Sequence, residues 1–335
     1  MFNVFGKISV GIDMDSKEIR IVALKLKKGK ISIVSCDKIN ISEGIIRDGI
    51  VVDPIKAGNV LYERISNTRL KRDKIILGIN NTDILVRFAN LPKVPEEKLK
   101  GLVKYQVQDY FPIPINNVEL DYMIAGEVTN KEGTFYKVML VAARKDMIEG
   151  FLKMMDEADI ELSDIDVSTL SIIRLLPVRK YEGTSLIINM DNDITGILLV
   201  EKGLPVLARI SAIGYVKMKE YLSRSEKIVA VSSTGAFIDR SGPVDSLMSE
   251  IRSSISYYNS RNDSADVEKI LLTGKIGSLD GFIKDMEDAF SIPVEIVNPF
   301  EEISGFTGNL EYDAAGISSY SVAASLALRG LEEYK

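Results

Sequence analysis

Two short polar loops, each at the end of an apolar strand, carry the residues of this chain best suited to chemistry. The first loop is residues 13–16 (DMDS), within a unit that spans residues 7–35. The second is residues 189–192 (NMDN), within a unit that spans residues 185–211. In each unit a second apolar strand, a turn and a third strand follow, which predicts a repeated strand-loop-strand motif and two similar lobes facing each other. Carboxylates in such loops can hold magnesium through water.

The composition excludes several kinds of catalysis. The chain has no histidine and a single cysteine, Cys36. It therefore has no Ser-His-Asp or Cys-His pair, and no histidine or multi-cysteine zinc site. A lone cysteine cannot form an internal disulfide, which is typical of a reducing cytoplasm. Enzymatic chemistry in this chain would rest on carboxylates, lysine and bound phosphate with magnesium.

Net charge and the distribution of apolar residues narrow the possible functions and locations of the protein further. The 335 residues carry a net charge of −6, which argues against general nucleic-acid binding because that function uses basic faces. The sequence has no run of roughly 18 apolar residues, so no membrane span is predicted. The first residues also lack the pattern of a secretory signal. We therefore expect a cytoplasmic protein with two domains.

The elements that must position the two loops alternate between strands and helices, so the expected fold class is α/β. The predicted divisions are a first lobe, an inserted subdomain, a return with a linker, a second lobe and a C-terminal helix packed on the first lobe, at residues 1–82, 83–160, 161–183, 184–317 and 318–335. Within the inserted segment a helix begins near residue 95, and a hairpin pairs residues 119–128 with 134–143. A further helix follows, whose predicted apolar stripe is Ile148, Phe151, Leu152 and Met155.

Several motifs in order along the chain resemble the PilM family of type IV pilus assembly proteins, which are actin-like relatives of the division protein FtsA. The motifs are GIDMDSKEIRIVAL, SEGIIRDGIVVD, VRFANLP, YQVQDYFPIPINNVELDY, ILLTGKIGSLDGF and SVAASLALRG. The resemblance covers nearly the whole chain and implies an actin-like two-lobed fold with an inserted subdomain of the FtsA/PilM type. A family member of the FtsA kind would be expected to continue into a C-terminal amphipathic helix, so the ending at Lys335 favours PilM.

The resemblance also implies which loops would hold a nucleotide. These positions are Asp13, Asp15, Ser16, Lys17, Asn189, Asp191, Thr195, Thr273, Gly274 and Lys275. ATP-binding relatives typically have Asp-x-Gly in both loops and Thr-Gly-Gly in the adenosine loop. Glycine there lets backbone N–H groups approach phosphate. In this chain Asp15 and Asp191 replace the two loop glycines, Asn189 replaces an acid, and Lys275 replaces the last glycine.

These replacements disfavour ATP and magnesium as cofactors. Each added carboxylate places a negative charge beside a polyphosphate. At about 4 Å and an effective dielectric constant near 20, one such contact costs about 4 kcal/mol. An extra magnesium ion bridging Asp15 or Asp191 to phosphate would be the way around this cost, and Asp13 would be the metal position if magnesium binds. We expect no catalytic residues.

The inserted segment favours a partner over a reaction. An edge strand near residues 84–90 would offer unpaired backbone groups to an extended peptide. The resemblance implies that the cytoplasmic tail of the membrane protein PilN docks between the inserted subdomain and the first lobe. The partner-binding residues implied by the matching motifs are Arg87, Leu91, Pro92, Tyr110 and Pro112.

Three functions follow as alternatives. The first is a cytoplasmic scaffold of pilus assembly, recruited to the inner face of the membrane by a PilN-like protein and in contact with other pilus assembly proteins. The second is a nucleotide-switched assembly ATPase of the same fold. The third is an FtsA-like, self-associating filament protein of division. The loop chemistry favours the scaffold.

Overall fold

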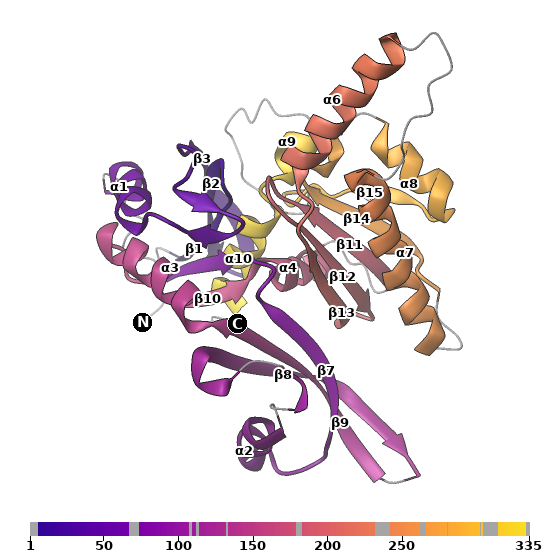
Figure 1. The fold of residues 1–335 in the computed structure, drawn as a ribbon. Coiled ribbons are helices and arrows are strands. Elements are labelled where there is room, and N and C mark those ends of the chain that lie inside the picture. Colours follow the sequence, from indigo (N-terminus) through magenta and orange to yellow (C-terminus); the bar gives the residue numbers. More distant parts are fainter. Residues whose placement is uncertain are drawn as a thin grey trace.

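The computed structural model describes residues 6–66, 74–106, 109–111, 114–131, 133–178, 183–231, 242–261, 266–279, 281–301, 303 and 314–332. Three larger sheets and one small two-stranded sheet form among these residues, and the three larger ones organise the fold (Figure 1). Two of them have five strands each and form the cores of two lobes. The third has three strands and extends away from the other two.

The sheet of the first lobe combines an antiparallel meander with two parallel strands. Its order is β10 (Asp164–Val167), β6 (Lys74–Ile79), β1 (Lys7–Met14), β2 (Glu18–Lys27) and β3 (Lys30–Asn40). Strands β1 to β3 pair antiparallel, whereas β6 pairs parallel with both β1 and β10. The β1–β2 register places Asp13 directly opposite Arg20.

The sheet of the second lobe repeats this arrangement. Its order is β13 (Leu204–Ser211), β12 (Thr195–Glu201), β11 (Thr184–Met190), β14 (Lys269–Gly274) and β15 (Val294–Ile296). Strands β11 to β13 form the antiparallel meander, and β14 and β15 are the parallel strands. The two sheets therefore match strand for strand, which confirms the duplication predicted from the two loop units.

The third sheet has the order β7 (Leu85–Pro92), β9 (Gly133–Arg144) and β8 (Val118–Asn130). The predicted hairpin is correct, since β8 and β9 pair with Thr129 opposite Thr134. Helix α2 (Glu96–Gln106) covers this sheet and buries Leu99 and Val103 against Leu91 and Leu140. Strands β7 and β8 are the two outer strands.

Helix α3 (Lys145–Glu157) follows the third sheet but packs against α1 (Pro54–Ile65) of the first lobe. The α1 helix begins at its predicted cap, where the Asp53 side chain accepts the backbone N–H of Lys56 at 3.1 Å. Three of the four residues of the predicted α3 stripe pack on the core, since Phe151 and Met155 are buried and Ile148 is partly buried. The buried side chains are Met147, Phe151, Met154 and Met155. Leu152 is 43% exposed, because the buried face is turned toward α1.

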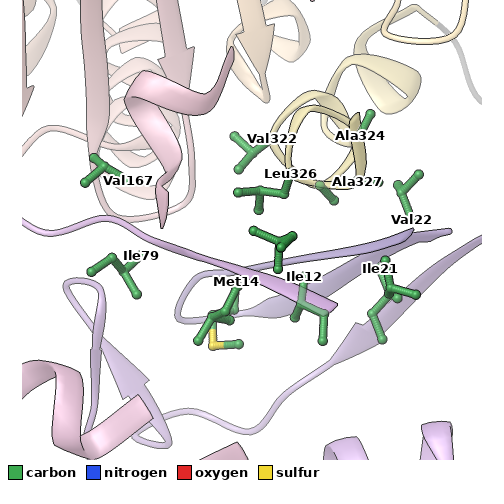
Figure 2. Packing of buried hydrophobic residues seen from close by; sticks show 14 of the residues in the cluster. Ile12, Met14, Ile21, Val22, Ile79, Val167, Val322, Ala324, Leu326 and Ala327 are labelled. Atoms are coloured by element: carbon green, nitrogen blue, oxygen red, sulfur yellow. The ribbon is translucent and has the colours of Figure 1, made fainter. Parts of the chain in front are cut away.

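Helix α10 (Ser321–Glu332) lies across the sheet of the first lobe and contacts β1, β2 and β6. Figure 2 shows Val322, Leu326 and Ala327 facing the sheet on the side to which Val22 points. Close approach is possible because β1 has Gly11 there. A Cβ on Gly11 would lie 1.9 Å from the carbonyl oxygen of Ala323. The C-terminal segment therefore completes the core of the first lobe.

The remaining described elements are short β4 (Ile46–Arg47) and β5 (Ile50–Val51), helices α4 (Ser168–Ser171), α5 (Leu175–Val178), α6 (Tyr215–Val231), α7 (Pro243–Arg261), α8 (Phe282–Phe290) and α9 (Ala314–Ser318), and the 3-10 turns η3 (Ile115–Asn117), η4 (Ile172–Arg174) and η5 (Ile276–Ser278). Helix α6 was not predicted, although Tyr215, Met218 and Leu222 recur at helical spacing. All three pack in the core of the second lobe.

Candidate functional site

The two polar loops face each other between the lobes and are bonded directly. Ser16 donates its backbone N–H to Asp193 Oδ2 at 2.9 Å and its hydroxyl to Asp193 Oδ1 at 2.5 Å. The Asn192 side chain donates to Asp15 Oδ1 at 2.9 Å. The tips of the duplicated strand-loop-strand units thus contact each other directly.

Arg20 occupies the centre of this contact. Its side chain has no exposed surface, and it extends from β2 past the end of β1. Its Nη2 lies 2.7 Å from Asp13 Oδ2, and its Nη1 lies 3.0 Å from Asp15 Oδ2 and 2.8 Å from Glu18 Oε1. Nη2 also lies 3.5 Å from Asp191 Oδ1 in the other lobe. One guanidinium therefore joins carboxylates of both loops.

The environment of Asp15 favours its ionised form. Burial opposes the charge, but the Arg20 guanidinium outweighs it, together with the bonds from Asn192 and from the backbone N–H groups of Lys17 and Glu18. The net effect lowers the pKa of Asp15. Asp15 is thus turned into its own loop and toward Arg20, which differs from the expectation that its charge faces a phosphate.

Asp13 and Asp191 behave in the opposite way. Burial raises the pKa of Asp191 well above its ordinary value, and the neighbouring Asp13 carboxylate adds to the effect. Burial also raises the pKa of Asp13, although Arg20 opposes that shift. For Arg20 itself burial disfavours the charge, but the surrounding carboxylates prevail and raise its pKa well above the ordinary value. The cluster therefore stabilises the charge of Arg20, whereas burial opposes the charge of Asp191.

The other predicted loop positions support this cluster or the local backbone. Thr273 donates to Asn189 Oδ1 at 2.9 Å, and Asn189 donates to Asp191 Oδ2 at 3.2 Å. The φ of Gly274 is +76°, and a Cβ there would lie 2.3 Å from the Met190 carbonyl oxygen. Glycine is therefore required where β14 meets β11.

Of the three further loop positions, two bond to other residues of the protein and the third is exposed. Lys275 Nζ lies 3.0 Å from Glu18 Oε2 and so adds another contact between the lobes. Thr195 donates its hydroxyl to the carbonyl oxygen of Ile213 at 2.5 Å. The Lys17 side chain is exposed at the surface.

These residues do not fit the magnesium and nucleotide that the fold implies. Asp13, the predicted metal position, is 1% exposed and bonded to Arg20. Within the described part of the chain, no three Asp, Glu or Cys side chains are placed to share a metal ion. A phosphate at this place would have to displace Arg20 from its carboxylates.

Arg20 and its partner Glu18 decide the site, and neither was predicted from the sequence. A signal was present in the sequence. Arg20 is a charged residue inside the strand EIRIVAL, where it stands between Ile19 and Ile21. A buried charge requires a partner, and the hairpin register places Asp13 opposite it.

The predicted partner-binding residues do not gather in one place. Leu91 is 1% exposed and belongs to the core of the third sheet, so it packs within the sheet and offers no contact surface. Pro92 is exposed at the end of β7. Arg87 is exposed, donates to the carbonyl oxygen of Val86 and lines a hollow of about 310 Å³ between β7 and the second lobe. Tyr110 lines a separate hollow of about 290 Å³. Pro112 lies outside the described residues.

A larger groove lies between the third sheet and the first lobe. Its volume is about 700 Å³. Strand β8 and helix α3 line one side, and β10, η4 and α10 line the other. Both β8 and β10 are outer strands of their sheets. Two apolar side chains in it are substantially exposed, Met123 at 40% and Leu152 at 43%.

Charged side chains brace the wall of this groove that the first lobe provides. Arg329 of α10 pairs with Asp166 at 2.7 Å and also with Asp164. Arg174 pairs with Asp166 at 2.9 Å and with Glu332 at 3.3 Å. These pairs tie strand β10 to α10 and η4, so the wall is a fixed part of the first lobe.

A comparison with known protein families finds a match over most of the chain. A family profile described as type IV pilus assembly protein PilM matches residues 11–226 and 243–331. The chain belongs to the PilM family. The match includes both lobes, the third sheet and most of helix α10, and it confirms the resemblance read from the motifs.

Solved structures agree on the fold. A structure described as the PilM-PilN type IV pilus biogenesis complex matches with a TM-score of 0.81 at 20% identity, covering 96% of this chain and 98% of that one. The ethanolamine utilization protein EutJ from Carboxydothermus hydrogenoformans matches with a TM-score of 0.51 at 14% identity, covering 96% and 89% of the two chains. The predicted actin-like α/β fold is therefore confirmed. In the described residues, no helix is both long and apolar enough to cross a bilayer.

Proposed function

We propose that this PilM-family chain is a scaffold of the type IV pilus assembly machinery that binds the cytoplasmic tail of a PilN-like membrane protein. The tail binds in the groove between the third sheet and the first lobe. Through this contact the protein is recruited to the cytoplasmic face of the membrane, where it contacts other pilus assembly proteins.

The groove between β8 and β10 carries this proposal. An extended peptide can pair its backbone with the free edge of an outer strand while its alternate side chains enter pockets. Here two outer strands border one hollow of about 700 Å³. Exposed apolar side chains that lie in a hollow are typical of a surface that a partner covers. Met123 and Leu152 are side chains of this kind.

The solved complex with the same fold supports the choice of partner. That structure is described as a complex of PilM with PilN. The site cluster around Arg20 supports a scaffold over a nucleotide-switched ATPase, since the loops that would cradle phosphate are bonded to each other.

The test is binding of a synthetic PilN-type tail peptide to the full chain, measured by calorimetry. Leu152→Asp places a charge in the apolar part of the groove and should weaken binding at least about tenfold, equivalent to about 1.4 kcal/mol. The matched control is Ile55→Asp, which changes another helix residue of similar exposure, 50%, outside the groove. Binding by Ile55→Asp should stay within about twofold of the wild type. Equal affinities for wild type and Leu152→Asp would refute the groove.

Arg87→Ala distinguishes the groove from the hollow beside β7. Arg87 is absent from the groove lining, so its loss should leave the affinity for the tail peptide nearly unchanged. A large loss with Arg87→Ala and none with Leu152→Asp would move the partner site to the hollow between β7 and the second lobe.

A further inference from the structure

Arg20 has a position that a structural core residue does not need. Its side chain is fully buried, yet it lies among four carboxylates, three from the first lobe and one from the second. A charged group in the interior is costly unless it is fully paired. The ion pairs of Arg20 form where the predicted nucleotide loops of the two lobes meet.

Three more contacts join the lobes around Arg20. Ser16 is bonded to Asp193, Asp15 to Asn192, and Glu18 to Lys275. Each contact uses a residue in or beside a loop that cradles phosphate in ATP-binding members of the fold. In ATP-binding members these loops contact the ligand, whereas in this chain they contact each other.

The charge of Arg20 also suits this role. Metal-bound phosphate would bring a cation to Asp13 and to the second loop. The guanidinium brings a positive charge to Asp13 and Asp191 at the same time, and its planar fork can bond several oxygens. An incoming polyphosphate would meet ionised Asp15 beside Arg20, whose own charge is already paired with carboxylates.

A short path leads from Arg20 to the partner groove. Asp13 Oδ1 accepts the hydroxyl of Ser168 at 3.3 Å, and Ser168 is the first residue of α4. It follows directly on β10, which forms one wall of the groove. Helix α4 also contacts β12 and β13 of the second lobe. The position of β10 is therefore tied to the same cluster that joins the lobes.

From this geometry we infer that Arg20 is a resident cation that replaces the metal-bound nucleotide as the clamp between the lobes, and that it holds the partner groove in its binding form without ATP. Arg20 is a positioning residue: it acts on the groove through Asp13, Ser168 and β10. The second half of the inference rests on the proposed function, whereas the clamp between the lobes does not.

The clamp is tested by amide hydrogen exchange of the full chain. The Ser16 N–H donates across the lobes to Asp193 Oδ2, so its exchange reports the clamp. Arg20→Met should raise the exchange rate in residues 13–17 about tenfold or more, and Arg20→Lys should give a smaller increase because it keeps the charge. The control is Arg64→Met, which removes an exposed ion pair with Asp37 and should change nothing in this loop.

Magnesium-ATP at millimolar concentration is added to the wild type in the same experiment. We expect no heat of binding in calorimetry and no change in exchange at residues 13–17. ATP binding that protects this loop would overturn the inference, as would unchanged exchange in a folded Arg20→Met protein. If Arg20→Met does not fold, unchanged exchange in Arg20→Lys overturns it.

Tail-peptide binding separates the two proposals. The wild-type affinity should be the same with and without magnesium-ATP, and Arg20→Lys should weaken it several-fold although Arg20 does not line the groove. If the wild type fails to bind the tail, the proposed function falls while the exchange result still decides the clamp. If the tail binds equally to wild type and Arg20→Lys, the groove stands and its coupling to Arg20 falls.

Discussion

Ser16 donates both its backbone N–H and its hydroxyl to the carboxylate of Asp193, a residue 177 positions away in the other lobe. A two-point bond of this kind fixes the distance and the orientation of the two loops together. In an actin-like fold that responds to nucleotide, these loops separate and approach around the ligand. In this chain they are already joined.

The Ser16–Asp193 bond should contribute measurably to stability. Asp193→Ala removes the acceptor of both bonds and should lower the free energy of unfolding by about 1–3 kcal/mol, because Ser16 is left without its partner. Urea denaturation measures the change. Asp146→Ala is the control, since it breaks an exposed pair with Arg144 and should cost less than about 1 kcal/mol. Equal losses in both variants would contradict the prediction.

The pH dependence of stability should reveal the buried Asp191. Burial raises its pKa in the folded protein, so the folded state binds a proton that the unfolded state has released. Stability from this group is complete below its ordinary pKa of 3.8 and is lost as the pH rises toward the raised value. Asp191→Asn removes this proton, so stability should fall less with rising pH than in the wild type. Urea denaturation across weakly acidic to weakly alkaline pH tests it; parallel curves would contradict it.

Two glycine substitutions should change stability in opposite directions. Gly11→Ala places a Cβ 1.9 Å from the Ala323 carbonyl oxygen, so α10 must move off the sheet, and we expect a loss of more than about 2 kcal/mol. Gly101→Ala, inside α2, meets nothing within 4 Å. It should gain about 0.5–1 kcal/mol because alanine favours the helix. Thermal unfolding of both variants measures the pair, and a neutral Gly11→Ala would show that α10 is less tightly packed than described.

Much of the fold was accessible from sequence because its signals are local. The duplicated units, the hairpin from β8 to β9 and the cap at Asp53 follow from alternation, turn residues and an N-cap. The site was less accessible. Arg20 could be suspected from its place in an apolar strand, but its partner Asp191 lies 171 residues away, and no local pattern reports that distance.

The groove shows a second limit of sequence patterns. The family motifs implied a partner site between the inserted subdomain and the first lobe, as in the proposed groove, but they drew attention to β7, where Arg87 and Tyr110 line other hollows. Helical periodicity placed Leu152 on the buried face of α3 because it is apolar and four positions after Ile148. Whether such a residue faces a core or a groove depends on which way the helix is turned against α1, and packing between distant segments decides that.

The third sheet should be removable as a unit. The two ends of the segment that forms this sheet lie side by side. Arg144 Nη1 lies 3.8 Å from Asp83 Oδ2, and Leu85 pairs with Ala142. Replacing residues 85–144 by a short Gly-Ser linker should therefore leave a folded two-lobed protein of lower stability. Removing residues 83–160 should prevent folding, because that deletion also takes away α3, whose Phe151 and Met154 are buried with α1 in the first lobe.

Circular dichroism and thermal unfolding compare the two deletions. The 85–144 deletion should keep slow exchange at residues 13–17, because the clamp around Arg20 lies in the two lobes, and it should lose binding of the tail peptide together with the β8 wall of the groove. A folded 83–160 deletion would show that α3 belongs to the inserted unit. Full tail binding by the 85–144 deletion would show that the partner site does not use the third sheet.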